Sequence, residues 1–209
     1  MVPLHDVTLT GDLWMPSQVF SMVIFAHGSG SSRLSPRNRM VAGFLNEQGI
    51  GTFLFDLLTE REDQDRANRF DLLKLSERLE QAAVWLHKQD KLKDLPTGFF
   101  GASTGAAAAL IAAELLPWIA AIVSRGGRPD LAMKSLPLVK ASTLLIVGSL
   151  DQEVIRLNQQ AYGHLSCEKK IEIVQGASHL FEEKGTMEKV CVLAANWFEM
   201  HLHPLELTR

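Results

Sequence analysis

Residues 98–116 read GFFGASTGAAAALIAAELL, and this stretch decides the predicted fold. A short apolar run, Gly98–Phe100, leads into an alanine-rich segment, Thr104–Leu116, through the five residues Gly101–Gly105. Short apolar runs bounded by glycine and polar residues are typical of buried strands, and alanine is the best helix former. The stretch therefore predicts a strand, a tight turn and a helix in succession.

The same alternation continues on both sides of this stretch. Other apolar runs predict buried strands, and segments with helical spacing or helix-capping residues predict helices between them. Strands and helices that alternate indicate an α/β fold with a mostly parallel sheet and helices on both faces. We expect residues 1–209 to form a single domain, with 7–15 as an antiparallel strand or hairpin at one edge. The other predicted strands are 22–26, 52–55, 119–123, 143–147 and 171–174, and the other helices are 36–48, 72–86, 153–165 and 187–202.

The composition is that of a globular protein with little net charge. The chain has 209 residues, 46% of them hydrophobic and 22% charged, and a net charge of −3 at pH 7. So mild a charge gives no indication of binding to nucleic acid or to a membrane surface. Residues 106–123 are nearly all apolar, but Glu114 and Pro117 interrupt them, so a buried helix and strand are predicted here rather than a membrane span.

The cysteines and the first residues predict a cytoplasmic location. Cys167 and Cys191 are too few for a disulfide framework or a cysteine-rich zinc site. The opening residues, MVPLHDVTLTGDL, lack the basic and apolar regions of a signal peptide.

Gly101–Gly105 fits the Gly-x-Ser-x-Gly pattern of a nucleophile elbow, in which a serine lies on a strained turn between strand and helix. Glycines without Cβ atoms let the strand and helix approach closely around Ser103. The N-terminus of the following helix offers N–H groups and positive partial charge to a developing negative charge. We predict Ser103 as a nucleophile; the alternative is that it only caps the helix.

A serine nucleophile needs a base, and that base needs an acid to orient it. Among seven histidines, His179 lies in a loop just past the predicted strand 171–174. Asp151 follows the predicted strand 143–147, where its alternative role is to cap the next helix. The order Ser103, Asp151, His179 is the nucleophile, acid and base order of α/β-hydrolases, and each residue follows a strand.

Residues 25–33, FAHGSGSSR, follow the predicted strand 22–26 and predict the second part of an oxyanion hole. Acyl transfer needs two backbone N–H groups that point at the developing oxyanion. We expect these from Thr104, directly after the nucleophile, and from Ser29. The alternative, a dinucleotide-binding Gly-x-Gly-x-x-Gly loop, is disfavoured because Arg33 occupies the third glycine position.

Taken together, these motifs resemble the α/β-hydrolase superfamily over nearly the whole chain, and more narrowly its small, lidless dienelactone hydrolase-like branch. The resemblance implies an α/β-hydrolase fold, the triad Ser103, Asp151 and His179, no metal and no organic cofactor. Ser103 stands where dienelactone hydrolase proper has a cysteine, which leaves the lactone substrate open. Some family members of this kind are fused to a phosphoribosyltransferase domain, of which this sequence shows no sign. The matching segments are His27–Gly30, Ser35–Asn38, Gly101–Gly105, Leu145–Asp151 and Gly176–His179.

Two segments bear on the substrate. About 18 residues separate the predicted strands 119–123 and 143–147, too few for a cap domain, so we expect an open site and a small-molecule substrate. Several arginines lie near the expected site, and we expect one or more of them to bind a substrate carboxylate or phosphate: Arg33, Arg37, Arg39, Arg125 and Arg128. The alternative is that these arginines pair with acidic residues of the charged segment 59–66, which reads as a solvated loop or a mobile flap.

The sequence thus predicts a serine hydrolase acting on an ester, thioester or lactone. The alternatives are a non-catalytic α/β-hydrolase scaffold that binds a ligand or partner, and an acyltransferase or peptidase that uses the same triad.

Overall fold

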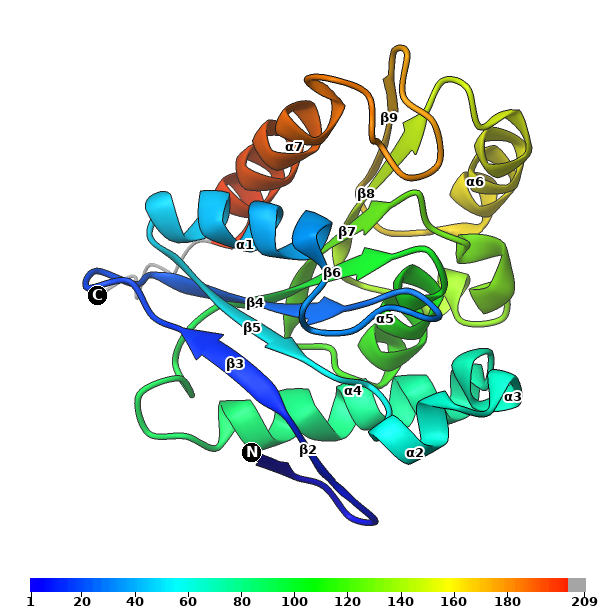
Figure 1. The fold of residues 1–209 in the computed structure, drawn as a ribbon. Coiled ribbons are helices and arrows are strands. Elements are labelled where there is room, and N and C mark those ends of the chain that lie inside the picture. Colours follow the sequence, from blue (N-terminus) through cyan, green and yellow to red (C-terminus); the bar gives the residue numbers. More distant parts are fainter. Residues whose placement is uncertain (203–209) are drawn as a thin grey trace.

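Seven strands form the central sheet of the computed structural model, which describes residues 1–202 (Figure 1). These strands are β3 (Gly11–Trp14), β4 (Ser21–Ala26), β5 (Ile50–Phe55), β6 (Thr97–Ala102), β7 (Ile119–Arg125), β8 (Ser142–Gly148) and β9 (Lys169–Val174). Their spatial order is β3-β5-β4-β6-β7-β8-β9, and only β3 runs antiparallel to its neighbour. The predictions of a mostly parallel sheet and of an antiparallel edge strand within 7–15 are confirmed.

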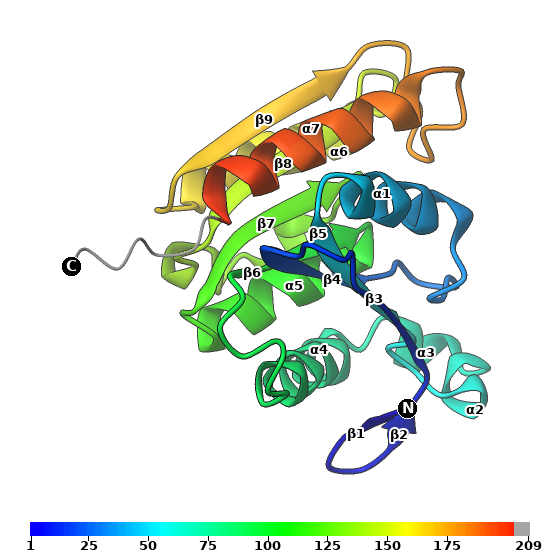
Figure 2. The same ribbon diagram turned by 90° about the vertical axis from the view of Figure 1, so that its left-hand side faces the viewer.

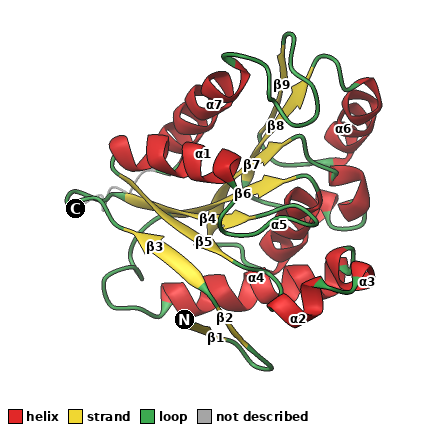
Figure 3. Cartoon of the chain, viewed as in Figure 1, coloured by secondary structure: helices red, strands yellow, loops and turns green. Residues whose placement is uncertain are grey.

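Helices cover both faces of this sheet, as predicted (Figures 2 and 3). Alternate residues of β4 explain how: Val23 and Phe25 pack into one hydrophobic cluster, and Met22 and Ile24 pack into the other. Because successive side chains of a strand point to opposite faces, a strand buried on both faces needs apolar residues at every position. The first cluster lies under α1 (Pro36–Glu47) and α7 (Thr186–His201), and the second lies under α4 (Leu72–His87), α5 (Thr104–Leu115) and α6 (Gln152–His164).

The segment after β5 differs from its predicted loop. It forms two short helices, α2 (Glu60–Asp63) and α3 (Arg66–Arg69), ahead of α4. The Thr59 side chain accepts from the Glu62 N–H, and the Glu62 carboxylate accepts from the Thr59 N–H, which is a complete capping box. The loop prediction was wrong because this capping box starts a helix despite the high charge of the segment.

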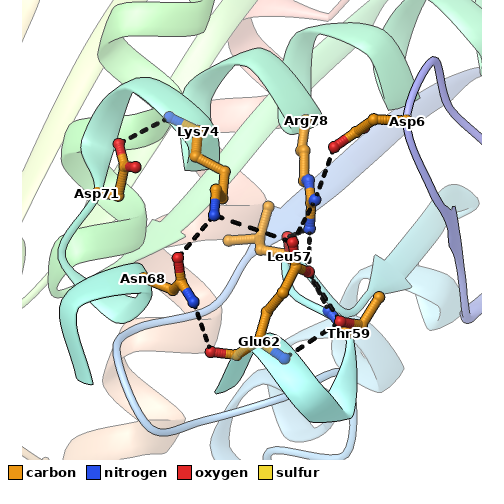
Figure 4. A network of polar contacts seen from close by, with 8 residues as sticks. All are labelled: Asp6, Leu57, Thr59, Glu62, Asn68, Asp71, Lys74 and Arg78. Atoms are coloured by element: carbon orange, nitrogen blue, oxygen red, sulfur yellow. Dashed lines mark hydrogen bonds and ion pairs between the residues drawn. The ribbon is translucent and has the colours of Figure 1, made fainter. Parts of the chain in front are cut away.

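A buried arginine holds this segment against α4 (Figure 4). Arg78 of α4, whose side chain is 3% exposed, donates to both carboxylate oxygens of Glu62 at 2.7 Å. It also donates to Asp6 at 3.0 Å and to the Leu57 carbonyl at 3.2 Å. Asp6 belongs to the connection between β1 (Val2–Pro3) and β2 (Thr8–Leu9), so one guanidinium joins three parts of the chain.

The connection between β7 and β8 is compact, as expected. It holds two short 3-10 helices, η1 (Pro129–Ala132) and η2 (Leu136–Leu138), and the part of the chain that the structure describes contains no cap domain. Within residues 1–202, no helix is both long and apolar enough to cross a membrane.

Strand order decides where the predicted site residues meet. The parallel strands β4, β6, β7, β8 and β9 are consecutive neighbours, so their carboxyl ends share one edge of the sheet. His27, Ser103, Asp151 and His179 all follow the ends of these strands. Ligands of open α/β sheets bind at this edge.

Candidate active site

Ser103 occupies a strained turn between β6 and α5. Its φ of 51° and ψ of −121° are unusual, since Phe181 is the one other described non-glycine residue with a positive φ. A Cβ at Gly105 would collide with the carbonyl oxygens of Ala26 and His27, so only glycine lets α5 start this close to β4. The Ser103 side chain makes no capping hydrogen bond. This geometry supports the nucleophile-elbow prediction over the helix-cap alternative.

Asp151 and His179 are in direct contact. Asp151 Oδ2 lies 2.6 Å from His179 Nδ1, although 28 residues separate them in the sequence. Asp151 stands at the N-cap position of α6, yet its carboxylate makes no capping bond there. The Asp151 side chain is 16% exposed and that of His179 is 39% exposed, so the acid is shielded while the imidazole stays accessible. This is the arrangement in which a carboxylate fixes the tautomer and orientation of a catalytic imidazole.

Ser103 and His179 line the same cavity of about 270 Å³. Within residues 1–202 the structure shows no hydrogen bond between their side chains; catalytic hydrogen bonds are often long in ligand-free sites and tighten around the substrate. The three predicted triad residues are therefore brought together, with the acid–base contact formed and the base–nucleophile contact open. The cavity is lined by Gly28, Ser29, Ser31, Ser35, Arg37, Asn38, Ala102, Ser103, Arg125, His179 and Leu180.

The two predicted oxyanion donors lie next to each other, but one of them is engaged. The Ser29 N–H donates to Thr104 Oγ1 at 2.9 Å, so the expectation of a free Ser29 donor does not hold in this structure. As the first residue of α5, Thr104 has an N–H without an acceptor within the helix. For Ser29 to serve an oxyanion, its N–H must be shared with Thr104 or released from it.

His27 fixes the loop that carries Ser29. Its Nδ1 lies 3.0 Å from the Gly28 carbonyl, and its Nε2 lies 3.0 Å from the Leu57 N–H. Since the Leu57 N–H can only donate, Nε2 must be the unprotonated acceptor and Nδ1–H the donor. Burial lowers the pKa of His27, an effect that outweighs the Gly28 hydrogen bond and the charges of Asp56 and Asp63. The neutral imidazole thus connects the Ser29 loop to the residues that follow β5 through these two hydrogen bonds.

Because His27 must be neutral to accept the hydrogen bond from Leu57, we predict that acid lowers the stability of the fold. The folded-state pKa of His27 lies below its ordinary value of 6.5, so its full stabilisation is present above pH 6.5 and is lost as the pH falls from there toward the lowered pKa. We expect His27→Gln, which keeps an acceptor but does not titrate, to lack this part of the acid destabilisation. Urea unfolding between pH 7.5 and 5 measures it, with the exposed His164→Gln as the matched control. Parallel pH curves for wild type and His27→Gln would contradict the assignment.

Of the predicted substrate-binding arginines, Arg37 and Arg125 line the cavity with Ser103. Arg125 ends β7 beside Ala102 of β6 and is 5% exposed, and its Nε–H finds no acceptor in the described part of the chain. Its guanidinium carbon lies 5.8 Å from the centre of the Phe181 ring. Burial lowers the pKa of Arg125 to about 10, with a smaller contribution from the Arg37 charge, so it remains a cation at neutral pH.

The structure places the other three arginines outside this cavity. Arg39 lies 3.2 Å from Asp12. Arg33 donates to Asp56 at 2.9 Å and lies 3.4 Å from Asp12, so its charge is compensated away from Ser103. Arg128 forms a bidentate pair with Asp130, with both distances 2.9 Å. Arg33 and Arg128 thus pair with acidic residues, as in the alternative interpretation, but these partners lie outside the segment 59–66.

Two polar residues of the cavity come from the start of α1: Arg37, which is among the predicted anion-binding arginines, and Asn38, which was not predicted as a site residue. Arg37 and Asn38 follow Ser35 and Pro36, whose capping signature placed the helix start correctly. The available signal was topological, because the start of α1 follows the loop that leaves β4 at the carboxyl edge.

Comparison with known proteins provides evidence that is independent of the geometry of the site. No family model matches the chain. Two curated relatives from Mycobacterium tuberculosis strains, each named "Putative phosphoribosyl transferase", are 52% identical to it over 197 residues. The match includes 94% of this chain, which spans only 44% of the relatives' length.

Solved structures match along nearly the whole chain. Est1E from Butyrivibrio proteoclasticus shares the fold with a TM-score of 0.82 at 14% identity, over 95% of this chain and 96% of that one. A dienelactone hydrolase from Anabaena variabilis has a TM-score of 0.94. Because it is 48% identical over 97% of this chain and 96% of its own, this chain belongs to the dienelactone hydrolase family of α/β-hydrolases.

Proposed function

We propose that this chain is a serine hydrolase that cleaves a small ester, thioester or lactone. The observation that carries the proposal is the 2.6 Å contact between Asp151 and His179 in a cavity lined by Ser103, which lies on a strained elbow. Its fold relatives include a dienelactone hydrolase and an esterase domain, which supports hydrolysis as the class of reaction. The name of the Mycobacterium relatives belongs to proteins more than twice as long as the shared segment.

In the proposed reaction, Ser103 Oγ attacks the substrate carbonyl carbon while His179 Nε2 takes its proton. Asp151 holds the imidazole through Nδ1 and stabilises the imidazolium. The N–H groups of Thr104 and Ser29 bind the oxyanion, with the Thr104 hydroxyl yielding or sharing the Ser29 donor. His179 returns the proton to the leaving group, and an acyl-enzyme forms. Water activated by His179 then releases the acid and restores Ser103.

A fluorophosphonate probe tests this proposal because it reacts with activated serines. We expect labelling of the folded protein, with the adduct on Ser103 in a peptide map, and none after heat denaturation. Absence of labelling in folded protein would favour the non-catalytic scaffold. Labelling with acyl transfer to an added alcohol or amine, but without hydrolysis, would favour an acyltransferase.

The substrate is proposed to carry a carboxylate or phosphate that Arg125 binds. Arg125 is 5% exposed and has no compensating anion within residues 1–202, which is costly to the fold, and an anionic ligand removes that cost. Arg37, which lines the same cavity, adds positive charge at its rim, where it also contacts Glu182 at 3.2 Å. A guanidinium also suits the planar, two-oxygen geometry of such anions.

Replacement of Arg125 by methionine tests the anion site. We expect kcat/KM for the thioester of succinate, which keeps one free carboxylate, to fall about 10- to 100-fold, since hydrogen bonds to charged groups contribute roughly 1.5–3 kcal/mol. The neutral butyrate thioester should change little, and the variant should unfold at higher urea because an unpaired buried charge is gone. Arg128→Met is the control, as Arg128 already pairs with Asp130. Equal losses on both thioesters would rule out selective anion binding.

A further inference from the structure

Asn38 is a second buried polar side chain without a partner in the Ser103 cavity. It is the third residue of α1, is 2% exposed, and its Oδ1 has no hydrogen bond within residues 1–202. Buried amide oxygens are nearly always bonded, so an orphaned one in a cavity calls for an explanation. Asn38 lines the cavity together with Ser103, Arg125 and His179.

Helix capping does not explain this residue. A polar side chain at the third helical position usually bonds back to the N–H of the N-cap residue. Here the N-cap is Ser35, and its N–H donates to the Ser32 carbonyl at 3.1 Å instead. The Asn38 N–H donates to Ser35 Oγ at 3.3 Å, so the cap is complete without the Asn38 side chain. The amide is therefore free to meet a ligand.

The two orphaned groups have opposite hydrogen-bonding character. Arg125 can only donate, whereas Asn38 Oδ1 can only accept. One ligand satisfies both if it offers an acceptor, preferably an anion, to Arg125 and a donor to Asn38. The charges in the cavity restrict that donor, because Arg37 and Arg125 both line it and repel an ammonium group. A neutral donor is therefore favoured, and a hydroxyl suits the Asn38 amide better than an N–H does because it can donate to Oδ1 or accept from Nδ2.

We propose that Asn38 is a specificity-determining residue that binds a hydroxyl group of the substrate. The site then takes hydroxylated anionic esters, thioesters or lactones, in which the anion meets Arg125 and the hydroxyl meets Asn38. This inference rests on the proposed acyl transfer at Ser103 for its kinetic part, but its binding part does not.

Thioesters of N-acetylcysteamine with small diacids test the kinetic part, since each keeps one free carboxylate. The set is succinate, 2-hydroxysuccinate, 3-hydroxysuccinate (both numbered from the thioester carbon) and the matching methylsuccinates, in which a methyl group replaces the hydroxyl at similar size. We expect wild type to hydrolyse one hydroxy thioester with a kcat/KM about 10- to 100-fold above that of its methyl counterpart. Asn38→Leu, of similar volume, should abolish this preference while fluorophosphonate labelling of Ser103 continues. Asn38→Asp keeps an acceptor but adds a negative charge, so it should slow all the anionic thioesters.

Thermal unfolding with the free diacids tests the binding part without any catalysis. Hydroxysuccinate should raise the unfolding temperature of wild type more than methylsuccinate does, and Asn38→Leu should show no difference between them. Equal shifts in wild type, or a preference that survives in Asn38→Leu, overturn the inference even when Ser103 is labelled. If labelling fails while the hydroxyl-dependent shift holds, the proposed hydrolase function is wrong and Asn38 still binds the hydroxyl.

Discussion

Ser103→Ala is expected to abolish fluorophosphonate labelling and to lower kcat for any hydrolysed ester on the order of 10⁶-fold. The loss is this large because, in the proposed triad, the serine, the histidine and the aspartate act as one unit, so that removing Oγ removes the attacking group and leaves only residual catalysis. The protein should remain folded, since Ser103 makes no capping bond to α5. Circular dichroism and urea unfolding provide the check on the fold. Activity that survives in this variant would exclude Ser103 as the nucleophile.

A comparison of Ser103→Ala with Ser103→Gly separates the backbone strain of the elbow from the chemistry of the hydroxyl. Ser103→Ala keeps the positive φ of 51° and with it the backbone strain, whereas Ser103→Gly removes the Cβ that causes it. Both variants should be inactive, but the glycine variant should be about 1 kcal/mol more stable than the alanine variant, after the entropic cost of glycine is included. If the alanine variant is the more stable of the two, the elbow is not strained in the way described.

The core of this fold could be predicted from the sequence because burial leaves a strong local pattern. Strands such as β4 and β8 are buried on both faces, so they read as unbroken apolar runs between polar or glycine-rich loops. Parallel strands bring their carboxyl ends to one edge of the sheet. Since Ser103, Asp151 and His179 each follow such a strand, in the order of α/β-hydrolases, we could predict that they meet. Their 2.6 Å acid–base contact agrees with that prediction.

Features that depend on partners distant in the sequence could not be predicted. Arg33 and Arg125 are indistinguishable as residue types, and only tertiary structure shows that Arg33 pairs with Asp56 while Arg125 Nε has no partner within residues 1–202. The engagement of the Ser29 N–H by Thr104 depends on a side-chain rotamer, which no sequence pattern specifies. Asn38 could be placed near a helix start, but its burial depends on how α1 packs beside the elbow.

The burial of Arg78 is another feature that could not be predicted from the sequence. An arginine on a helix is normally exposed, yet Arg78 is 3% exposed because α2 and α3 fold over it and supply Glu62. This matters for the site, since Asp63 and Arg69 of that segment line a small cavity together with His27 and Ser29. The network therefore fixes one wall beside the Ser29 loop.

Breaking this network is expected to have the largest effect on stability among the changes considered. Glu62→Gln leaves the buried Arg78 charge with only the exposed Asp6 carboxylate and the Leu57 carbonyl. Loss of one partner of a buried ion pair typically costs 3–5 kcal/mol, and because the Glu62 side chain is 24% exposed we expect about 2–3 kcal/mol. Urea unfolding at pH 7 measures this, and Asp90→Asn in the exposed Lys93–Asp90 pair is the control, with an expected change below about 0.5 kcal/mol.

Two further measurements test whether this loss of stability in Glu62→Gln comes from the charge of Glu62. The double variant Glu62→Gln with Arg78→Met should recover part of the stability, because it removes the uncompensated cation as well. Hydrogen bonding from Arg78, against a smaller opposing effect of burial, lowers the pKa of Glu62 to about 2. The wild-type advantage over Glu62→Gln should therefore be complete above pH 4.5 and should shrink as the pH falls toward 2. An advantage that stays constant across this range, or a double variant less stable than Glu62→Gln alone, would show that Glu62 acts through packing and not through its charge.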